Sequence, residues 1–122
     1  MLLYLALTST NTTYQVQQAC TKGLDALAIN EDTDKTTSTW EHIRTSANLV
    51  YMSPEISRSA LFTQKLWKDA KFRKRVATFI VDEVHCIDEW GEDDFRSAYR
   101  LLSDVRRFLG LDVPFWFQKA SL

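Results

Sequence analysis

The chain has 122 residues, of which 45 % are hydrophobic and 25 % charged, and its formal net charge is -1 at pH 7. This length allows one domain with a modest core, and the composition is that of an ordinary soluble globular protein. The near-neutral charge excludes a whole-chain bias toward nucleic acid or a membrane, although it permits a local basic patch.

The sequence predicts no membrane partner, because no apolar stretch approaches the ~20 residues that a spanning helix needs. The opening run MLLYLALTST has no basic residue before a short apolar segment, so a buried strand fits it better than a secretory signal. Cys20 and Cys86 match no metal-ligand spacing and suggest no disulfide framework, which favours a reducing compartment.

The first part of the chain predicts a strand, a helix and a second strand. Leu2–Leu7 is a short apolar run typical of a buried strand. Thr12 or Thr13 can cap the helix that follows, and Gly23 can terminate it. The inward face of this helix is formed by Val16, Ala19 and Cys20, with Lys22 in the last turn. Ala26–Ile29 is the second strand.

The middle of the chain predicts a helix, a third strand and a further helical stretch. Asp32 or Asp34 can cap the helix. Its inward residues are Trp40, Ile43 and Ala47. Leu49–Met52 is the third strand, and Pro54 after Ser53 fits the first turn of the next helix. That helical stretch carries apolar residues four apart, at Phe62, Leu66 and Ala70.

The last part of the chain predicts a fourth strand, the clearest helix and a final strand. The basic segment Lys71–Arg75 is interpreted as a solvated turn before the strand Val76–Val81, with a phosphate-backbone contact as the alternative. The helix ends at Gly110. Its inward face is Ala98, Leu101, Leu102, Val105 and Phe108, and Arg106 and Arg107 suit its C-terminal end. Val113–Phe117 is the final strand.

This alternation of short apolar strands with amphipathic helices indicates an α/β fold, a mostly parallel sheet with helices on both faces. In such sheets, ligands gather at the carboxyl ends of the strands. Asp82 and Glu83 stand at that end of the fourth strand. One carboxylate can hold Mg²⁺ and the other can orient a water for attack on a phosphoryl group. The alternative is that this pair simply ends a strand and starts a turn.

The residues around this acidic pair resemble a known family. The run Ile80–Ile87, IVDEVHCI, resembles the Asp-Glu-x-His box of superfamily 2 helicases. Trp90-Gly91, Asp94-Phe95-Arg96 and Tyr99 resemble the aromatic-rich loop that follows the box in RecQ-type DNA helicases. Further similarity lies in Ala28–Asn30, Val50–Glu55, the fungal-like link Lys71–Arg75, and Val113–Phe115 before motif III.

The resemblance implies a RecA-like P-loop NTPase lobe, with residues 1–122 forming part of a helicase ATP-binding domain. It implies an ATP-dependent DNA helicase that translocates 3′ to 5′ and acts in DNA repair or recombination. The implied cofactors are ATP and Mg²⁺, and the implied partner is single-stranded or forked DNA. A nuclear location follows from the same resemblance, and the oligomeric state stays open.

The resemblance also implies roles for individual residues. Asp82 takes the Mg²⁺ role, Glu83 polarises the attacking water, and His85 couples the nucleotide site to the DNA-responsive elements. From the residues alone, a satisfied loop histidine is the preferred interpretation of His85. A cysteine nucleophile at Cys86 is disfavoured because neighbouring side chains rarely face each other. A zinc site is disfavoured because His42 and His85, the two histidines, form no ligand pattern.

The DNA-sensing loop implied by the resemblance contains Trp90, Phe95, Arg96 and Tyr99. Aromatic faces stack bases at roughly 1–3 kcal/mol each, and guanidinium groups meet phosphates or stack, so these residue types suit the role. The alternatives are that Trp90 and Phe95 are core residues and that Tyr99 is the first inward residue of the next helix.

The chain departs from the family pattern in several places. Its three glycines, Gly23, Gly91 and Gly110, do not form the phosphate loop Gly-x-x-x-x-Gly-Lys-Ser/Thr, so that loop and the second RecA-like lobe are expected to lie outside residues 1–122. The motif III-like residues Ala120 and Ser121 follow a lysine where the family has a small hydroxyl residue. Acids gather in the DNA-sensing loop, at Asp88, Glu89, Glu92, Asp93 and Asp94, and repel phosphate.

Three hypotheses follow. The first is a fragment of a helicase motor that does not hydrolyse ATP as an isolated chain. The second is a non-catalytic remnant that binds DNA or a partner. The third is a fragment that fails to fold stably, because unpaired edges of a parallel sheet remain.

Overall fold

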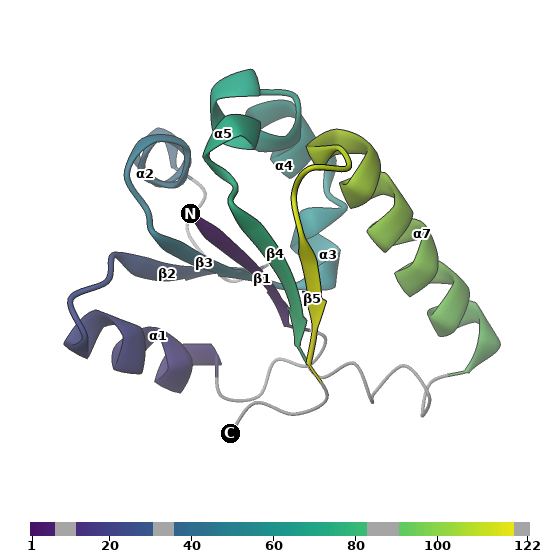
Figure 1. Cartoon of the computed structure of the whole chain (residues 1–122), viewed down its shortest axis with the longest axis horizontal. Coiled ribbons are helices and arrows are strands. Elements are labelled where there is room, and N and C mark those ends of the chain that lie inside the picture. The colour runs from purple at the N-terminus through teal and green to yellow at the C-terminus, as the bar shows by residue number, and fades with distance from the viewer. Residues whose placement is uncertain (7–11, 31–35, 83–90, 119–122) are drawn as a thin grey trace.

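The computed structural model describes residues 1–6, 12–30, 36–82 and 91–118 (Figure 1). Within these residues, five parallel strands form one sheet in the order β2-β3-β1-β4-β5. The strands are β1 (Leu2–Ala6), β2 (Ala26–Ile29), β3 (Leu49–Met52), β4 (Thr78–Asp82) and β5 (Phe115–Phe117). Because all strands are parallel, their carboxyl ends lie at the same edge of the sheet.

Helices cover both faces of this sheet, which confirms the predicted α/β class. They are α1 (Thr12–Thr21), α2 (Thr37–Thr45), α3 (Pro54–Ser57), α4 (Ala60–Phe62), the π-helical turn η1 (Thr63–Trp67), α5 (Ala70–Arg75) and α7 (Glu92–Leu109). Figure 1 shows α1 on one side of the sheet, with α2, α4, α5 and α7 around the other. No helix in the described part of the chain combines the length and the apolar character that crossing a bilayer demands.

The larger core lies on the face covered by α2, η1, α5 and α7. Alternate residues of the central strands point into it, among them Leu3, Val50 and Phe79, each fully buried. The indole of Trp67 from η1 stacks on the ring of Phe108 from α7, with centroids 5.7 Å apart and an interplanar angle of 7°. Full burial of such large side chains contributes about 1.5–3 kcal/mol each, so this face carries most of the stability.

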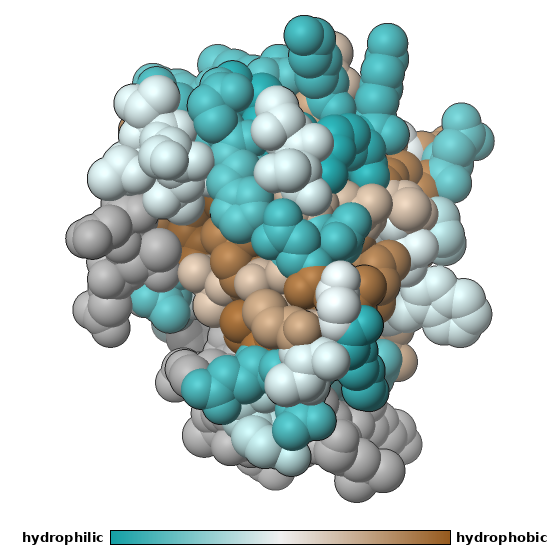
Figure 2. Space-filling view, turned by 90° about the vertical axis from the view of Figure 1, so that its left-hand side faces the viewer, coloured by the Kyte–Doolittle hydropathy of each residue, from teal (hydrophilic) through white to brown (hydrophobic). Residues whose placement is uncertain are grey.

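A smaller core lies on the opposite face, under α1. Its buried residues are Ala19, Ala26, Leu49 and Tyr51, with Tyr4, Val16 and Ala28 packed against them. This is the smaller layer because, among the described helices, α1 is the one that packs against it. Figure 2 shows the side of the molecule that carries the edge strand β2, where an apolar band lies between hydrophilic surfaces.

The two predicted glycine terminators are confirmed. Gly23 and Gly110 have φ angles of 86° and 83°, a region that side chains rarely adopt. The amide of Gly23 donates to the carbonyl of Cys20 at 3.0 Å, and that of Gly110 donates to Arg106 at 2.8 Å. Both glycines therefore close their helices in left-handed backbone geometry.

The predicted cap of the second helix was wrong. The N-cap of α2 is Thr36, whose hydroxyl accepts a hydrogen bond from the amide of Thr39 at 3.3 Å, rather than Asp32 or Asp34. A capping side chain must stand directly before the first helical residue to reach the second or third amide beyond it. Thr36 has that position because the helix starts at Thr37.

The single helical stretch predicted around Phe62, Leu66 and Ala70 is divided into α3, α4, η1 and α5. Phe62 and Leu66 are fully buried as predicted, but Ala70 is exposed. The helices α4 and α5 begin where a polar side chain accepts from the backbone: Ser59 from the amide of Phe62 at 3.1 Å, and Asp69 from that of Lys71 at 2.8 Å. Such local bonds compete with a continuous helix.

The basic segment Lys71–Arg75 belongs to helix α5 and is not the solvated turn predicted from sequence. Lys71 and Lys74 are exposed, whereas Arg75 donates to two backbone carbonyls near the end of α2. The fourth strand therefore begins at Thr78, two residues later than predicted, because Val76 forms the C-cap of α5. The last strand, β5, is likewise shorter than Val113–Phe117.

Candidate functional site

Asp82 lies at the carboxyl end of β4, between β1 and β5 in the sheet. It aligns with Ala6 of β1 and is 2 % exposed. Alternation along the strand puts it on the same face as Ile80, the face covered by α1. A buried carboxylate at a central strand tip needs hydrogen-bond or ionic partners, because an isolated charge in such a place is costly.

One partner of Asp82 comes from helix α1. The amide nitrogen Nε2 of Gln15 donates to Oδ2 of Asp82 at 3.5 Å, the long end of hydrogen-bond distances. Gln15 is in the first half of α1, so the start of this helix lies at the tip of β4. The sequence does not predict this contact of Gln15, because the residue pattern of α1 does not reveal how the helix is rotated over the sheet.

Two tyrosines lie below Asp82 on the same face. Tyr4 and Tyr51 occupy the same register on neighbouring strands, and their ring centroids are 4.9 Å apart. Tyr4 donates its hydroxyl to Oε1 of Gln118 at 3.2 Å. The amide of Gln118 donates to the carbonyl of Val81 at 2.8 Å, which holds the residue after β5 against β4.

The environment of these tyrosines favours their neutral forms. Burial, then the neighbouring Tyr4 and then the Asp82 carboxylate raise the pKa of Tyr51 to about 12. Burial also raises the pKa of Tyr4, opposed by its hydrogen bond to Gln118 and assisted by Asp82. Both hydroxyls therefore remain protonated donors near a carboxylate at neutral pH. Sequence reasoning placed Tyr4 and Tyr51 only within apolar strands, and their equal register is visible only in the structure.

The Ser53-Pro54 pair marks the same sheet edge at the end of β3. Ser53 is the N-cap of α3 and accepts from the amide of Ile56 at 3.2 Å, with Pro54 in the first turn as predicted. Glu55 adds an exposed acid to that turn. The family-like Ser-Pro-Glu segment and Asp82 thus end two strands of one sheet, separated by β1 in the strand order.

Several predicted site residues fall outside the described part of the chain. These are Glu83, His85, Trp90, Ala120 and Ser121. Phe95 lies within α7, but its side chain is also outside the described part. The roles expected for these residues stay predictions.

Arg96 and Tyr99 lie on the exposed surface of α7. Nη2 of Arg96 forms an ion pair with Oε1 of Glu92 at 2.6 Å. Tyr99 is 68 % exposed, so the interpretation of Tyr99 as an inward core residue is wrong. Figure 1 shows the start of α7 away from the tip of β4.

The described residues offer a carboxylate of the kind that Mg²⁺ binds. They contain no group of three or more His, Cys, Asp or Glu side chains arranged around a common point. Mg²⁺ is commonly held by one or two carboxylates together with phosphate oxygens and water, so Asp82 alone suits that donor set. His42 is engaged elsewhere, with Nε2 2.8 Å from Oδ1 of Asp25.

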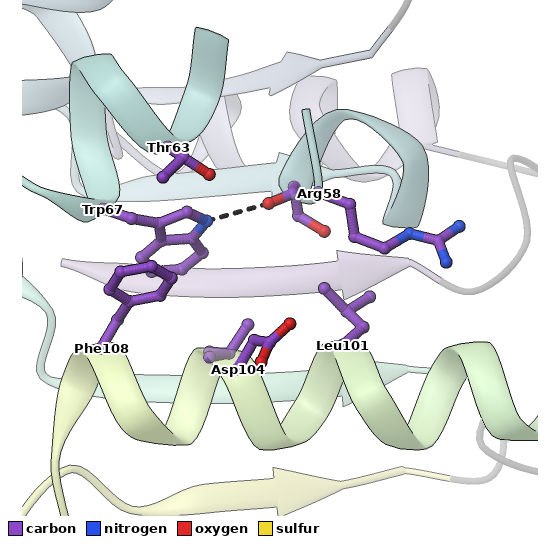
Figure 3. A pocket seen from close by; sticks show the side chains of 8 residues that line it. Arg58, Thr63, Trp67, Leu101, Asp104 and Phe108 are labelled. Atoms are coloured by element: carbon purple, nitrogen blue, oxygen red, sulfur yellow. Dashed lines mark hydrogen bonds between the residues drawn. The ribbon is translucent and has the colours of Figure 1, made fainter. Parts of the chain in front are cut away.

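A separate hollow of about 240 Å³ lies between η1 and α7 (Figure 3). Trp67 faces Leu101 and Phe108 across it, and the indole Nε1 donates to the carbonyl of Ser57 at 2.9 Å. Arg58 and Asp104 also line it. None of the residues predicted from the sequence to form the site contributes to this hollow.

Asp82 thus lies at the carboxyl ends of the parallel strands, where ligands of open α/β sheets gather. The family model described as DEAD/DEAH box helicase matches residues 6–113, and the chain belongs to that family. Within it, the sequence is of the RecQ type, as comparison with individual relatives indicates.

Three relatives illustrate this similarity. The chain is 33 % identical over 95 residues to the ATP-dependent helicase wrn-1 of Caenorhabditis elegans, a match that covers 75 % of the chain and 8 % of the relative. It is 34 % identical over 91 residues to the ATP-dependent DNA helicase Q1 of Pongo abelii (70 % and 14 %). It is 38 % identical over 65 residues to the ATP-dependent DNA helicase RecQ of Synechocystis (52 % and 13 %). The chain therefore spans about a tenth of the length of these relatives.

Solved structures support the fold. The DUF1998 helicase MrfA, in a crystal structure bound to DNA, matches 99 % of the chain with a TM-score of 0.69 and 19 % identity. A second MrfA structure matches 98 % with a TM-score of 0.62 and 20 % identity. The chain covers 17 % and 20 % of those molecules. The predicted RecA-like helicase lobe is thereby confirmed at the level of the fold.

Proposed function

We propose that residues 1–122 form part of the ATP-binding domain of an ATP-dependent DNA helicase that translocates 3′ to 5′. The observation that carries this proposal is the buried carboxylate of Asp82 at the tip of a central parallel strand. The family match adds support, since the relatives are named as ATP-dependent helicases. A nuclear location is part of the same proposal.

In this proposal, the acid pair acts on a nucleotide bound at the sheet edge. Asp82 is the Mg²⁺ ligand, and Mg²⁺ when bound neutralises charge on the phosphates. Glu83 polarises the attacking water, and His85 relays the state of the site to DNA-responsive elements. Gln15 is suited to orient Asp82, because its amide donates to the carboxylate at 3.5 Å. Ala120 and Ser121 are assigned to the motif III-like coupling segment.

DNA is the proposed partner of the segment that contains Trp90, Phe95, Arg96 and Tyr99. The exposure of Tyr99 supports this assignment, because a stacking residue must be accessible to a base. The MrfA helicase is described as bound to DNA, which is consistent with a DNA partner for a lobe of this fold.

The isolated chain is proposed to be inactive in ATP hydrolysis. The triphosphate needs a glycine-rich loop whose backbone amides wrap it, and none of Gly23, Gly91 and Gly110 lies in such a sequence. A second candidate function, non-catalytic binding of DNA, is favoured by the exposed Arg96 and Tyr99.

The test of the motor role is a chimera in which residues 6–113 replace the matching segment of a RecQ-type host helicase. The chimera is expected to hydrolyse ATP when single-stranded DNA is added, and Asp82→Asn or Glu83→Gln is expected to lower kcat by about a hundredfold or more. Lys74→Ala, at an exposed helical position, is the control and is expected to keep the rate. A folded chimera whose turnover survives both acid substitutions would overturn the proposal.

The proposed inactivity is tested on the purified 122-residue chain. Phosphate release is expected to stay at the level of buffer with or without DNA. Clear turnover that Glu83→Gln abolishes would show that the chain can hold the triphosphate without a glycine-rich loop.

A further inference from the structure

Helix α7 carries a cationic groove on its outward side. Of the residues that line it, only Arg96 and Tyr99 belong to the DNA-sensing loop. The groove has a volume of about 360 Å³ and is lined by Arg96, Tyr99, Arg100, Ser103, Asp104 and Arg107. These positions are spaced three or four residues apart, so they share one stripe of the helix. The opposite stripe, Ala98, Leu101 and Val105, is buried against the sheet.

The groove arginines differ from their neighbour Arg106. Arg106 donates to the carbonyl of Val113 at 2.6 Å and lies over the ring of Phe115 at 3.6 Å, so it is committed to the fold. Arg100 forms no ion pair with any residue in the described part of the chain. Arg107 is 80 % exposed and reaches Asp104 only at 3.5 Å.

The charge balance of the groove is positive. Three guanidinium groups face one lining acid, Asp104, and a second acid, Glu92, pairs with Arg96 from the preceding turn. Surface ion pairs of this kind contribute little, so they do not prevent exchange for a phosphate oxygen. A guanidinium presents two parallel N–H donors that match the two oxygens of a phosphate.

We propose that this groove, beyond the family-like loop, binds the backbone of single-stranded DNA, with Arg100 and Arg107 as phosphate contacts and Tyr99 as a base-stacking platform. The inference rests on the DNA partner of the proposed function. From Arg96 to Arg107 the helix rises ~16 Å. A DNA strand covers that length with several nucleotides, at ~3.4 Å per nucleotide. Tyr99 lies between Arg96 and Arg100 on that length and is exposed, which favours a nucleic acid over an acidic peptide.

The test uses the purified chain and a fluorescently labelled oligothymidine of about sixteen nucleotides at low salt, with binding followed by anisotropy. Arg100→Ala with Arg107→Ala is expected to weaken binding about tenfold or more and to make the salt dependence shallower by about 1.4 in the log–log slope, since ~0.7 is lost per single-strand phosphate contact. Tyr99→Ala is expected to weaken it about tenfold.

The matched control is Lys71→Ala with Lys74→Ala, which removes the same charge from the exposed face of α5. This control is expected to keep affinity within about twofold. Asp104→Asn is expected to tighten binding about twofold to threefold, because it removes the acid that lines the groove. Each variant is checked for an unchanged thermal melt.

Three outcomes would overturn the groove assignment: no measurable binding by the wild-type chain, an equal loss in the lysine control, or displacement of DNA by polyglutamate as effectively as by unlabelled oligothymidine. The chimera test is independent of these results. DNA-stimulated ATP hydrolysis by the chimera that Asp82→Asn lowers, together with unaltered DNA binding by the arginine variants, would leave the motor role standing and remove the groove. Arginine-dependent binding with a chimera that is insensitive to Asp82→Asn would do the reverse.

Discussion

Arg75 donates from Nη2 to the backbone carbonyl of Ala47 at 2.6 Å and from Nη1 to that of Ile43 at 2.7 Å. A cation near the C-terminal end of α2 also interacts favourably with the helix dipole. The basic segment that sequence suggested as a solvated turn or a phosphate contact therefore contains a residue that joins α5 to α2.

Replacing Arg75 by Ala is expected to lower the free energy of unfolding by about 2 kcal/mol, because two carbonyls lose a charged donor. Arg75→Lys is expected to recover only part of this, since an ammonium group cannot reach both carbonyls in the fork geometry of a guanidinium. Urea denaturation measures both. The neighbouring exposed Lys74→Ala should change stability by less than about 0.5 kcal/mol, and a similar loss there would refute the structural role of Arg75.

Trp67 provides a second test of the packing. Its indole is 1 % exposed, stacks on Phe108 and donates to the carbonyl of Ser57 at 2.9 Å. Trp67→Ala is expected to cost about 3–5 kcal/mol. Trp67→Phe keeps much of the apolar volume but removes the N–H donor, so a loss of about 1–2 kcal/mol is expected. Equal losses in the two variants, measured by chemical denaturation, would show that the hydrogen bond rather than the volume dominates.

The raised pKa of Tyr51 predicts a loss of stability at high pH. Its pKa is about 12 in the folded chain, against an ordinary value of 10.0. Between these values the unfolded chain releases a proton that the folded chain keeps, so the stabilisation is complete below pH 10 and falls as the pH rises toward 12. At about 1.4 kcal/mol per unit, a pKa difference of about two units corresponds to about 2.7 kcal/mol, and screening by solvent at the sheet edge lowers the expected loss to on the order of 1–2 kcal/mol.

Tyr51→Phe isolates this contribution because it removes the titrating hydroxyl and keeps the ring. As the pH rises from 10 to 12, the unfolding free energy of the wild type is expected to fall relative to that of the variant. A difference that stays constant over that range would contradict the raised pKa.

The strand pattern was largely predictable from the sequence. The runs ALAI and LVYM became β2 and β3 with the predicted bounds, because each is a short apolar run between polar residues. The parallel order followed from the alternation with helices. Left-handed glycines ended α1 and α7 as expected, since that conformation favours the residue type.

The helical region after β3 was less predictable because two local signals compete there. The spacing of Phe62 and Leu66 indicated their burial correctly. The hydroxyl of Ser59 and the carboxylate of Asp69, however, cap new helices and interrupt the run. Apolar periodicity reports which face is inward, whereas side-chain bonds to the backbone decide where each helix begins.

The candidate site likewise contains one residue that the sequence could predict and others that it could not. Asp82 was predictable because it directly follows an apolar run in the sequence. Gln15, Tyr4 and Gln118 were not, because they reach the site through helix rotation, strand register and the return of the chain after β5. These are long-range relationships that a local pattern does not contain.

The relation between Asp82 and the two tyrosines gives a last prediction. Asp82→Asn removes a negative charge that helps to raise the pKa of Tyr51, so the titration of Tyr51 is expected to move to lower pH. It should still remain above pH 10, because burial is the larger cause and the amide preserves it. The measurement is tyrosinate absorbance after rapid pH jumps, with Asp82→Asn/Tyr51→Phe as the reference that identifies the Tyr51 signal.

The matched control is Glu55→Gln, which removes an exposed acid from the first turn of α3 at the same sheet edge. Solvent screens its charge, so the titration of Tyr51 should not move. An equal shift in both variants would mean that net charge, and not the proximity of Asp82, acts on Tyr51. No shift in Asp82→Asn would mean that the carboxylate faces away from the tyrosines, which would also weaken its assignment to the candidate site.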